Sequence, residues 1–361
     1  LVLCPLTVRF SKYRLRQGLR LEMFVASCGT TSQPSEESVL RTDAVRASTN
    51  AIYHWKTTFE PDDSELDFLG RHDVGRIYLR MFDVATEQNY ETGALDIVPI
   101  ATTRFLCEIP DTTEIVPTVY ITLDALRAMN GREAVFAELI TERLLAMANY
   151  NRCGLIREIQ FDCDWTTTTR RSYAALCHAA KNRLEPLHIA LSVTVRLHQL
   201  SEEAPPADRG VLMLYNTGAI KDSSTYNSIL DPKDCIPYLT KQRYGIPLDF
   251  AYPVFGWGVW FRNGKFQAIL RMTDFENDRL YRREAKGIYR VKHPHTADGK
   301  QLVAGDEIRM ERPSAVEVLQ VKALVERALG TPYRNNILYH FDNNQLSYYT
   351  DHEISCIYSL D

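Results

Sequence analysis

Two kinds of hydrophobic pattern alternate along the chain from residue 51 onward. Short runs in which apolar and polar residues take turns predict β-strands, and the longer segments between them, with apolar residues at a period of about 3.6, predict helices. Eight strands are expected, over residues 52–59, 76–84, 115–122, 158–165, 190–199, 210–217, 248–255 and 337–344. Strands separated by helices pair in parallel. We therefore predict an α/β fold, a (β/α)8 TIM-type barrel over residues 51–361.

Helical patterns occupy most of the connections between these strands. They run from Pro61 toward His72, over 124–150, over 169–183, from Asp231 onward, over 313–329 and over 351–360. The connections 85–114 and 201–208 carry no clear helix. An open doubly wound sheet is the alternative fold, but no glycine-rich phosphate loop follows any strand. The dipeptide Asn263-Gly264 predicts a β-hairpin insertion after strand seven, at the mouth of the barrel.

Polar residues at the carboxyl ends of the strands form the candidate site, because binding and catalytic residues of such barrels lie there. Alternation along the fourth strand points Asp162 and Asp164 into the barrel, one above the other. On the fifth strand it points Arg196 and His198 inward beside them. A buried carboxylate is costly unless it is paired or functional, so at least one of the two is expected to have a shifted pKa.

The same analysis of the other strand ends completes the candidate set. The candidate catalytic residues are Asp164 and Asp162, and the candidate substrate-binding residues are Arg80, Asp83, Trp165, Arg196, His198, Tyr215, Asn216, Tyr252, Trp257 and Asp342. Structural interpretations stand beside these assignments. Inward Asp–Arg pairs often fix strand register, histidines such as His198 and His340 are often core residues, and Trp257 and Trp260 can simply form the packed face of the hairpin.

Charge and cysteine spacing limit the classes of partner. The formal net charge is −4, which gives no basic footprint for a nucleic-acid partner, and none is expected. The eight cysteines show neither C-x-x-C nor zinc-site spacing. We expect no cofactor and no metal.

The first 50 residues carry a targeting signal. Residues 25–29, Val-Ala-Ser-Cys-Gly, resemble a bacterial lipobox with arginines upstream, although Glu22 interrupts the apolar stretch that such leaders need. The polar segment 30–50 is typical of a flexible tether. We expect residues 1–50 to be a leader and tether with a lipid on Cys28, and the barrel to be anchored to a membrane in the cell envelope, on the periplasmic face or the outer surface.

The end of the fourth strand resembles a known enzyme motif. Phe161-Asp162-Cys163-Asp164-Trp165 is similar to the end of the D-x-x-D-x-D-x-E signature of chitinase-type glycoside hydrolases, which are (β/α)8 barrels. In that family the final Glu protonates the leaving group, and the Asp before it holds the acetamido group of the substrate. Here Asp162 and Asp164 match the last two Asp positions, whereas Ile159 occupies the first Asp position and Thr166 that of the Glu. The resemblance implies a sugar site without its proton donor.

A second resemblance covers most of the chain. The segments 53–59, 159–166, 195–200, 208–218 and 249–261 resemble a family of uncharacterised Bacteroidetes cell-envelope lipoproteins. The resemblance implies a barrel and an envelope location, in agreement with Cys28, but it supplies no reaction.

Three functions remain open from the sequence. The first is a carbohydrate-active, glycoside hydrolase-like barrel anchored in the bacterial cell envelope, with Asp164 as the reacting carboxylate and a glycan or oligosaccharide as partner. Glycosidases pair two carboxyl groups about 5–5.5 Å or about 6.5–9.5 Å apart, and Asp83 or Asp342 can supply the second from across the mouth. The alternative, motivated by Thr166, is a non-catalytic glycan-binding barrel. The third is a structural envelope protein whose filled barrel has no pocket.

Overall fold

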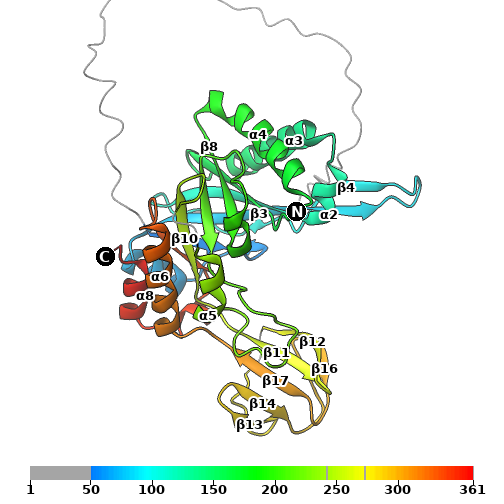
Figure 1. The fold of residues 1–361 in the computed structure, drawn as a ribbon, viewed down its shortest axis with the longest axis vertical. Helices are drawn as coiled ribbons and strands as arrows, with labels where there is room; N and C mark the ends of the chain where they lie inside the picture. Colours follow the sequence, from blue (N-terminus) through cyan, green and yellow to red (C-terminus); the bar gives the residue numbers. More distant parts are fainter. Residues whose placement is uncertain (1–49, 241–242, 272–273, 361) are drawn as a thin grey trace, which may run out of the picture. The chain divides into compact units, whose positions relative to one another are not determined.

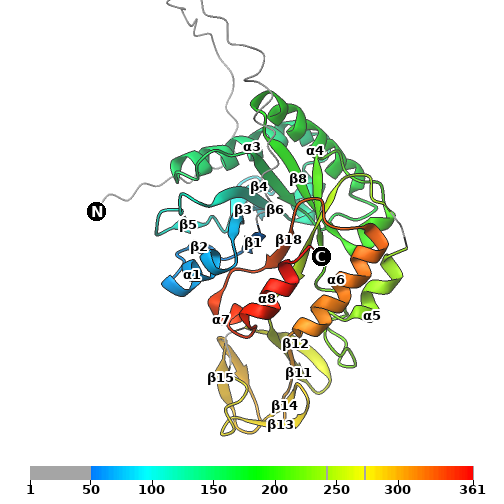
Figure 2. The ribbon, with the colours of Figure 1, turned by 90° about the vertical axis from the view of Figure 1, so that its left-hand side faces the viewer.

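Eight parallel strands close into a barrel in the computed structural model, which describes residues 50–240, 243–271 and 274–360 (Figures 1 and 2). Their order around the barrel is β1-β18-β10-β9-β8-β7-β6-β3, and β1 pairs with both β18 and β3, which closes the sheet. The strands are β1 (Asn50–His54), β3 (Val74–Gln88), β6 (Glu114–Ile121), β7 (Glu158–Asp162), β8 (Ala190–Arg196), β9 (Arg209–Met213), β10 (Leu248–Pro253) and β18 (Asn336–Tyr339). The predicted (β/α)8 fold is therefore confirmed.

Helices lie outside the barrel strands (Figure 2), and several of them begin with a side-chain cap. The α-helices are α1 (Asp63–Arg71), α2 (Leu123–Ala128), α3 (Glu133–Tyr150), α4 (Arg170–Leu184), α5 (Pro232–Cys235), α6 (Ala315–Leu329), α7 (Asn343–Leu346) and α8 (Asp351–Tyr358), with 3-10 turns η2 (Glu185–Leu187), η3 (Leu197–Ser201) and η4 (Ile236–Tyr238). Asp62 begins α1 with a capping box, as Ser314 does for α6, so these polar residues satisfy amide groups that the first turn leaves open. Among the described residues, no helix has the length and apolarity needed to cross a membrane.

Several strands end earlier than their hydrophobic patterns predict. Strand β7 stops at Asp162 and β8 at Arg196, after which the chain turns into η3. Gln199 stabilises this turn, because its side-chain oxygen accepts from the Arg196 amide at 2.8 Å and its side-chain nitrogen donates to the Trp165 carbonyl at 2.8 Å. On these two strands the inside–outside alternation therefore ends three residues before the sequence indicates, which moves candidate residues out of the barrel wall.

The predicted hairpin is present, but it is one part of a larger insertion between β10 and α6. Strands β11 (Trp257–Arg262) and β12 (Lys265–Leu270) meet at Asn263-Gly264, where both residues have positive φ. They continue into a five-stranded antiparallel sheet with β13 (Tyr281–Ala285), β14 (Ile288–Val291) and β17 (Glu307–Glu311), and β15 (His295–Ala297) with β16 (Lys300–Leu302) forms a further hairpin. This insertion has its own apolar core, which includes Trp260.

The irregular connection 85–114 is explained by two short additions to the barrel. Strand β4 (Leu95–Ile100) pairs antiparallel with the long β3 and extends it beyond the barrel wall (Figure 1). Strand β5 (Arg104–Phe105) pairs with β2 (Thr58–Phe59). The connection from β8 to β9 holds η3 and a loop without an α-helix, in agreement with the sequence.

Side chains fill the interior of the barrel, and charged side chains lie at the end where the strands begin. Glu158, with a side chain 3% exposed, lies 3.1 Å from Arg209 and 3.7 Å from Arg76. Higher up, the Tyr53 hydroxyl donates to Gln160 at 2.7 Å, and Gln160 donates to Ser192 at 3.2 Å. These contacts show that Gln160 and Ser192 face the interior of the barrel.

Candidate functional site

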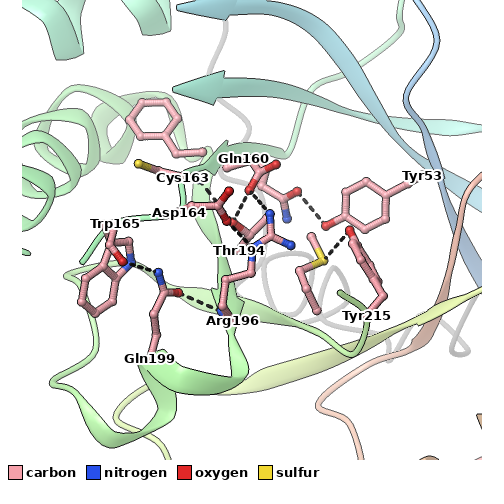
Figure 3. Close-up of polar contacts among 12 residues, drawn as sticks. Tyr53, Gln160, Cys163, Asp164, Trp165, Thr194, Arg196, Gln199 and Tyr215 are labelled. Atoms are coloured by element: carbon pink, nitrogen blue, oxygen red, sulfur yellow. Dashed lines mark hydrogen bonds and ion pairs between the residues drawn. The ribbon is translucent and has the colours of Figure 1, made fainter. Parts of the chain in front are cut away.

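Arg196 joins the two carboxylates that the sequence singled out. Its Nε donates to Asp164 at 2.5 Å and its Nη2 donates to Asp162 at 3.3 Å (Figure 3). The Arg196 guanidinium carbon lies 5.7 Å from the centre of the Tyr215 ring, within cation–π range. The predicted neighbourhood of strands β7 and β8 is confirmed, with one arginine between two acids.

The two carboxylates lie in different surroundings. The Asp162 side chain is 5% exposed and accepts a hydrogen bond from the Thr194 hydroxyl at 2.6 Å, whereas the Asp164 side chain is 45% exposed. Burial raises the pKa of Asp162, and Arg196 and Thr194 offset only part of that rise. The prediction that one of the pair has a shifted pKa holds for Asp162, the deeper residue.

A hollow of about 220 Å³ opens beside Asp164 at the mouth of the barrel. Its lining is mixed aromatic and polar, from Asp164, Arg196, Leu197, His198, Tyr215, Asn216, Thr217 and Tyr238. Asn216 has a φ of +57°, a conformation that Asn tolerates better than most residues, and its exposed side chain stands at the rim. Asp164, Arg196 and Asn216 therefore share one rim, as expected, and a filled barrel without a pocket does not describe this structure.

The remaining carboxylates predicted at the mouth each contact a cation. Asp83 forms a two-pronged contact with Arg80, with 2.7 Å between Arg80 Nε and Asp83 Oδ1. Asp342 lies 3.3 Å from Lys56 and also caps α7. Neither acid lines the hollow. The sequence placed both acids at the mouth, and the structure shows each in an ion pair.

Three candidate residues have positions that differ from the prediction. Trp165 is 1% exposed and contributes to a separate hollow beside Tyr173 of α4, on the helix-facing side that it shares with Phe161 and Cys163 of the same alternating run. Tyr252 is fully buried, and alternation along β10 puts it on the outer face, where burial and then Glu326 of α6 raise its phenol pKa. His198 is exposed in η3 at the edge of the hollow, so it is neither a core histidine nor an inward strand residue.

The two hairpin tryptophans have separate roles. Trp260 packs in the core of the insertion, as the structural interpretation predicts. Trp257 packs against the barrel core, with its ring 5.2 Å from Phe255, and its indole N–H donates to Glu311 at 2.8 Å. Phe255 in turn lies 6.0 Å from Tyr215. Tyr215 and Phe255 form what is called here the aromatic wall of the site. Trp257 packs behind this wall and does not line the hollow.

Sequence reasoning missed several residues near the site. Tyr120 of β6 is aligned with both Asp83 and Asp162, and burial followed by the charges of Asp164 and Asp162 raises its pKa to about 12. Tyr339 stacks within 4.6 Å of Tyr215. Alternation along the third strand identifies Tyr120, whereas Tyr238 lies in the short helical turn η4, and a helical pattern does not show that its side chain reaches the mouth.

The arrangement is suited to holding a neutral polar ligand. The described residues contain no group of three or more His, Cys, Asp or Glu placed to hold a metal ion. Burial lowers the pKa of His340 to about 4, so this histidine is neutral near pH 7. Tyr215 offers an aromatic surface, and His198, Asn216 and Thr217 offer hydrogen-bonding groups, the combination found in small-ligand sites.

Comparison with known proteins identifies the fold. No family model matches the sequence, and no curated protein matches it. Neither comparison supports the resemblance to Bacteroidetes lipoproteins. Among solved structures, the chitinase from Chromobacterium violaceum is similar over 83% of this chain and 97% of its own, with a TM-score of 0.51 and 14% identity. The Bacillus cereus spore cortex-lytic enzyme SleL covers 86% of this chain and 74% of its own, with a TM-score of 0.49 and 14% identity. The chain is thus a (β/α)8 barrel similar in fold to the Chromobacterium chitinase.

Proposed function

We propose that the protein binds a glycan at the mouth of the barrel and does not cleave it. The observation that carries this proposal is the hollow beside Tyr215, which combines an aromatic surface with hydrogen-bonding side chains and contains a single carboxylate, that of Asp164, paired with Arg196. At about 220 Å³ it is smaller than the roughly 300–1,000 Å³ of sites for drug-sized ligands. It is suited to one sugar unit at the end of a longer chain.

The ion pairs argue against hydrolysis. A glycosidase needs a carboxylic acid that keeps its proton until the leaving group departs, and an apolar, unpaired setting provides this. Asp164 is hydrogen-bonded to Arg196, and Asp83 and Asp342 are paired in the same way. Thr166, at the position that the chitinase-type signature gives to Glu, hydrogen-bonds to Thr168 at 2.9 Å and does not line the hollow.

One observation favours a second candidate, a glycoside hydrolase that uses Asp162 as its acid. Burial raises the pKa of Asp162, as a general acid requires. Its side chain is 5% exposed, however, and it lies beneath Asp164 without lining the hollow. Binding without hydrolysis is therefore the function that the geometry supports better.

A glycan array followed by calorimetric titration tests the proposal. Because the strand-four motif resembles one that holds an acetamido group, oligosaccharides of N-acetylglucosamine are the first probes, and neutral hexose polymers are the comparison. We expect saturable binding, and no shorter products after prolonged incubation when the mixture is analysed by mass spectrometry. Absence of binding to every glycan would reject the proposal, and appearance of shorter products would favour the hydrolase.

We also propose that the barrel is lipid-anchored in the cell envelope. The lipobox-like segment and Cys28 support this, although both lie outside the described residues. Expressed in a bacterial host, the chain should incorporate a labelled fatty acid and partition with membranes, and Cys28→Ala should abolish both. Cys107→Ala, at an exposed cysteine of the barrel domain, is the matched control and should change neither. Unaltered labelling of the Cys28→Ala protein would contradict the anchor.

A further inference from the structure

A buried glutamate links the insertion to the loop that lines the hollow. Glu311, at the end of β17, has a side chain with no exposed surface, and it accepts hydrogen bonds from groups of three segments. The Ser228 hydroxyl donates at 2.6 Å, the Trp257 indole at 2.8 Å and the Arg309 guanidinium at 2.7 Å. A buried carboxylate with three donors is well satisfied, and removal of its charge leaves Arg309 buried without its partner.

The Ser228 contact leads directly to the rim of the hollow. Ser228 belongs to the segment between β9 and α5, residues 214–231, called here the β9 loop. The Gly218 amide donates to the Ser228 carbonyl at 3.2 Å, and the Thr217 amide donates to the next carbonyl, that of Ile229, at 3.4 Å. Thr217 and its neighbour Asn216 line the hollow. Glu311 thus holds the β9 loop at Ser228, and the part of the loop that pairs with this segment, at Asn216 and Thr217, lines the hollow.

Two further contacts strengthen the same connection. Arg309 donates to the carbonyls of Asp222 at 2.7 Å and Ile220 at 3.1 Å, both in the β9 loop. On the other side, Glu311 orients Trp257, which packs on Phe255 and through it on Tyr215. The β9 loop and the aromatic wall are therefore both connected to the same buried carboxylate, that of Glu311.

We infer that Glu311 is a positioning residue for ligand recognition, which fixes the β9 loop and the aromatic wall in the shape that a sugar unit requires. The inference rests on the proposed glycan-binding function. It assigns the insertion a part in recognition, although the hollow is lined by residues from the barrel strands and their loops alone.

The test compares Glu311→Gln with Ser228→Ala and with a control on the same strand. Glu307→Gln is that control, because Glu307 pairs with Arg290 at the partly exposed edge of the insertion. Glu311→Gln keeps the side-chain shape and removes the charge, and Ser228→Ala removes only the hydrogen bond from Ser228 to Glu311 and leaves the contacts of Arg309 with the loop. Binding of the N-acetylglucosamine tetramer is measured by calorimetry, and amide hydrogen exchange over residues 216–218 is measured without ligand.

We expect Glu311→Gln and Ser228→Ala each to weaken tetramer binding by about tenfold, the effect of one lost hydrogen bond, and to speed exchange at Thr217 and Gly218. Glu307→Gln should alter neither. Tetramer affinity within twofold of the native value in Ser228→Ala, a variant that leaves Arg309 and Trp257 paired, would overturn the inference. If the native protein binds no glycan, the proposed function fails, and the exchange measurement still decides the link: unchanged exchange in both variants would overturn it.

Discussion

Asp162 and Asp164 show at the scale of single residues how two like side chains acquire different properties. They are two positions apart on β7 and its exit, and both contact Arg196, but only Asp162 is buried. For Asp162, burial outweighs the attraction of Arg196 and the Thr194 hydrogen bond, so its pKa in the folded protein is raised. The unfolded chain has an ordinary Asp pKa of about 3.9.

This difference predicts a pH dependence of stability. Between the unfolded and folded pKa values of Asp162, the folded state binds more protons, so the free energy of unfolding falls as pH rises through that window. Asp162→Asn lacks this titration. The melting temperature of the native protein, relative to that of Asp162→Asn, should therefore decrease from about pH 4 upward.

Thr194→Val provides the companion variant for this measurement. It keeps the carboxylate and removes the hydrogen bond that favours its ionised form, so the pH-dependent loss should extend to higher pH. A relative melting temperature that increases with pH, or that stays level, would show that the pKa of Asp162 is not raised.

Strand patterns predicted elements better than they predicted where each element ends. The eight strands and the inward positions of Asp162, Thr194 and Arg196 follow from period-two alternation, and the parallel pairing follows from the helices between the strands. Beyond the strand ends the prediction succeeded for Asp164, Tyr215 and Asn216, which line the hollow, and failed for others. Trp165 and His198 follow the ends of β7 and β8, where the hydrogen bonds of Gln199 redirect the chain. Local polar contacts of this kind leave no periodic signal.

Tyr252 and the insertion show two other limits. Tyr252 lies on β10 in a run buried on both faces, so hydrophobicity does not reveal that it faces the helices. The five-stranded insertion depends on pairing of β11 with β17, about 50 residues apart in sequence, and only its first hairpin has a local turn signal. The link between Glu311 and Ser228 depends on the same long-range contact.

The hairpin turn provides a stability prediction at the scale of elements. Gly264 has a φ of +72° with open space around its Cα, so Gly264→Ala meets no clash but forces alanine into a left-handed conformation. We expect a loss of about 1–2 kcal/mol in stability, measured by denaturant unfolding. Gly70→Ala, in α1 with equal space and no positive φ, is the matched control and should be neutral or stabilising. Equal effects of the two substitutions would contradict this account.

At the scale of the whole molecule, the barrel has charged residues at the end where its strands begin and the hollow at the mouth, where its strands end. Glu158 of β7 is 3% exposed and lies between Arg209 of β9 and Arg76 of β3, each two strands away around the barrel and far along the strands from the hollow. This is an arrangement in which charges fix strand positions. The charges there stabilise the barrel, whereas the ion pairs at the mouth lie near the proposed glycan site.

Glu158→Gln tests this division. Removal of one member of a buried charge cluster leaves two arginines without full compensation, and such changes cost about 3–5 kcal/mol. Glu142→Gln, which removes a half-exposed pair with Arg183, should cost about 1 kcal/mol or less. Both are measured by denaturant unfolding, and glycan affinity of the folded Glu158→Gln protein should remain within twofold of native. A cost as small as that of the control would remove the structural role assigned to Glu158.

The central claim, sugar binding at the mouth, is tested most directly by titration of the native protein and one double variant with its best glycan. His198→Ala with Asn216→Gly removes two exposed hydrogen-bonding side chains of the hollow, and glycine accepts the positive φ of position 216. His178→Ala, an exposed histidine on α4, is the control. We predict at least a tenfold weaker affinity for the double variant, with melting temperature and control affinity unchanged. Native affinity in the double variant would show that the ligand binds elsewhere.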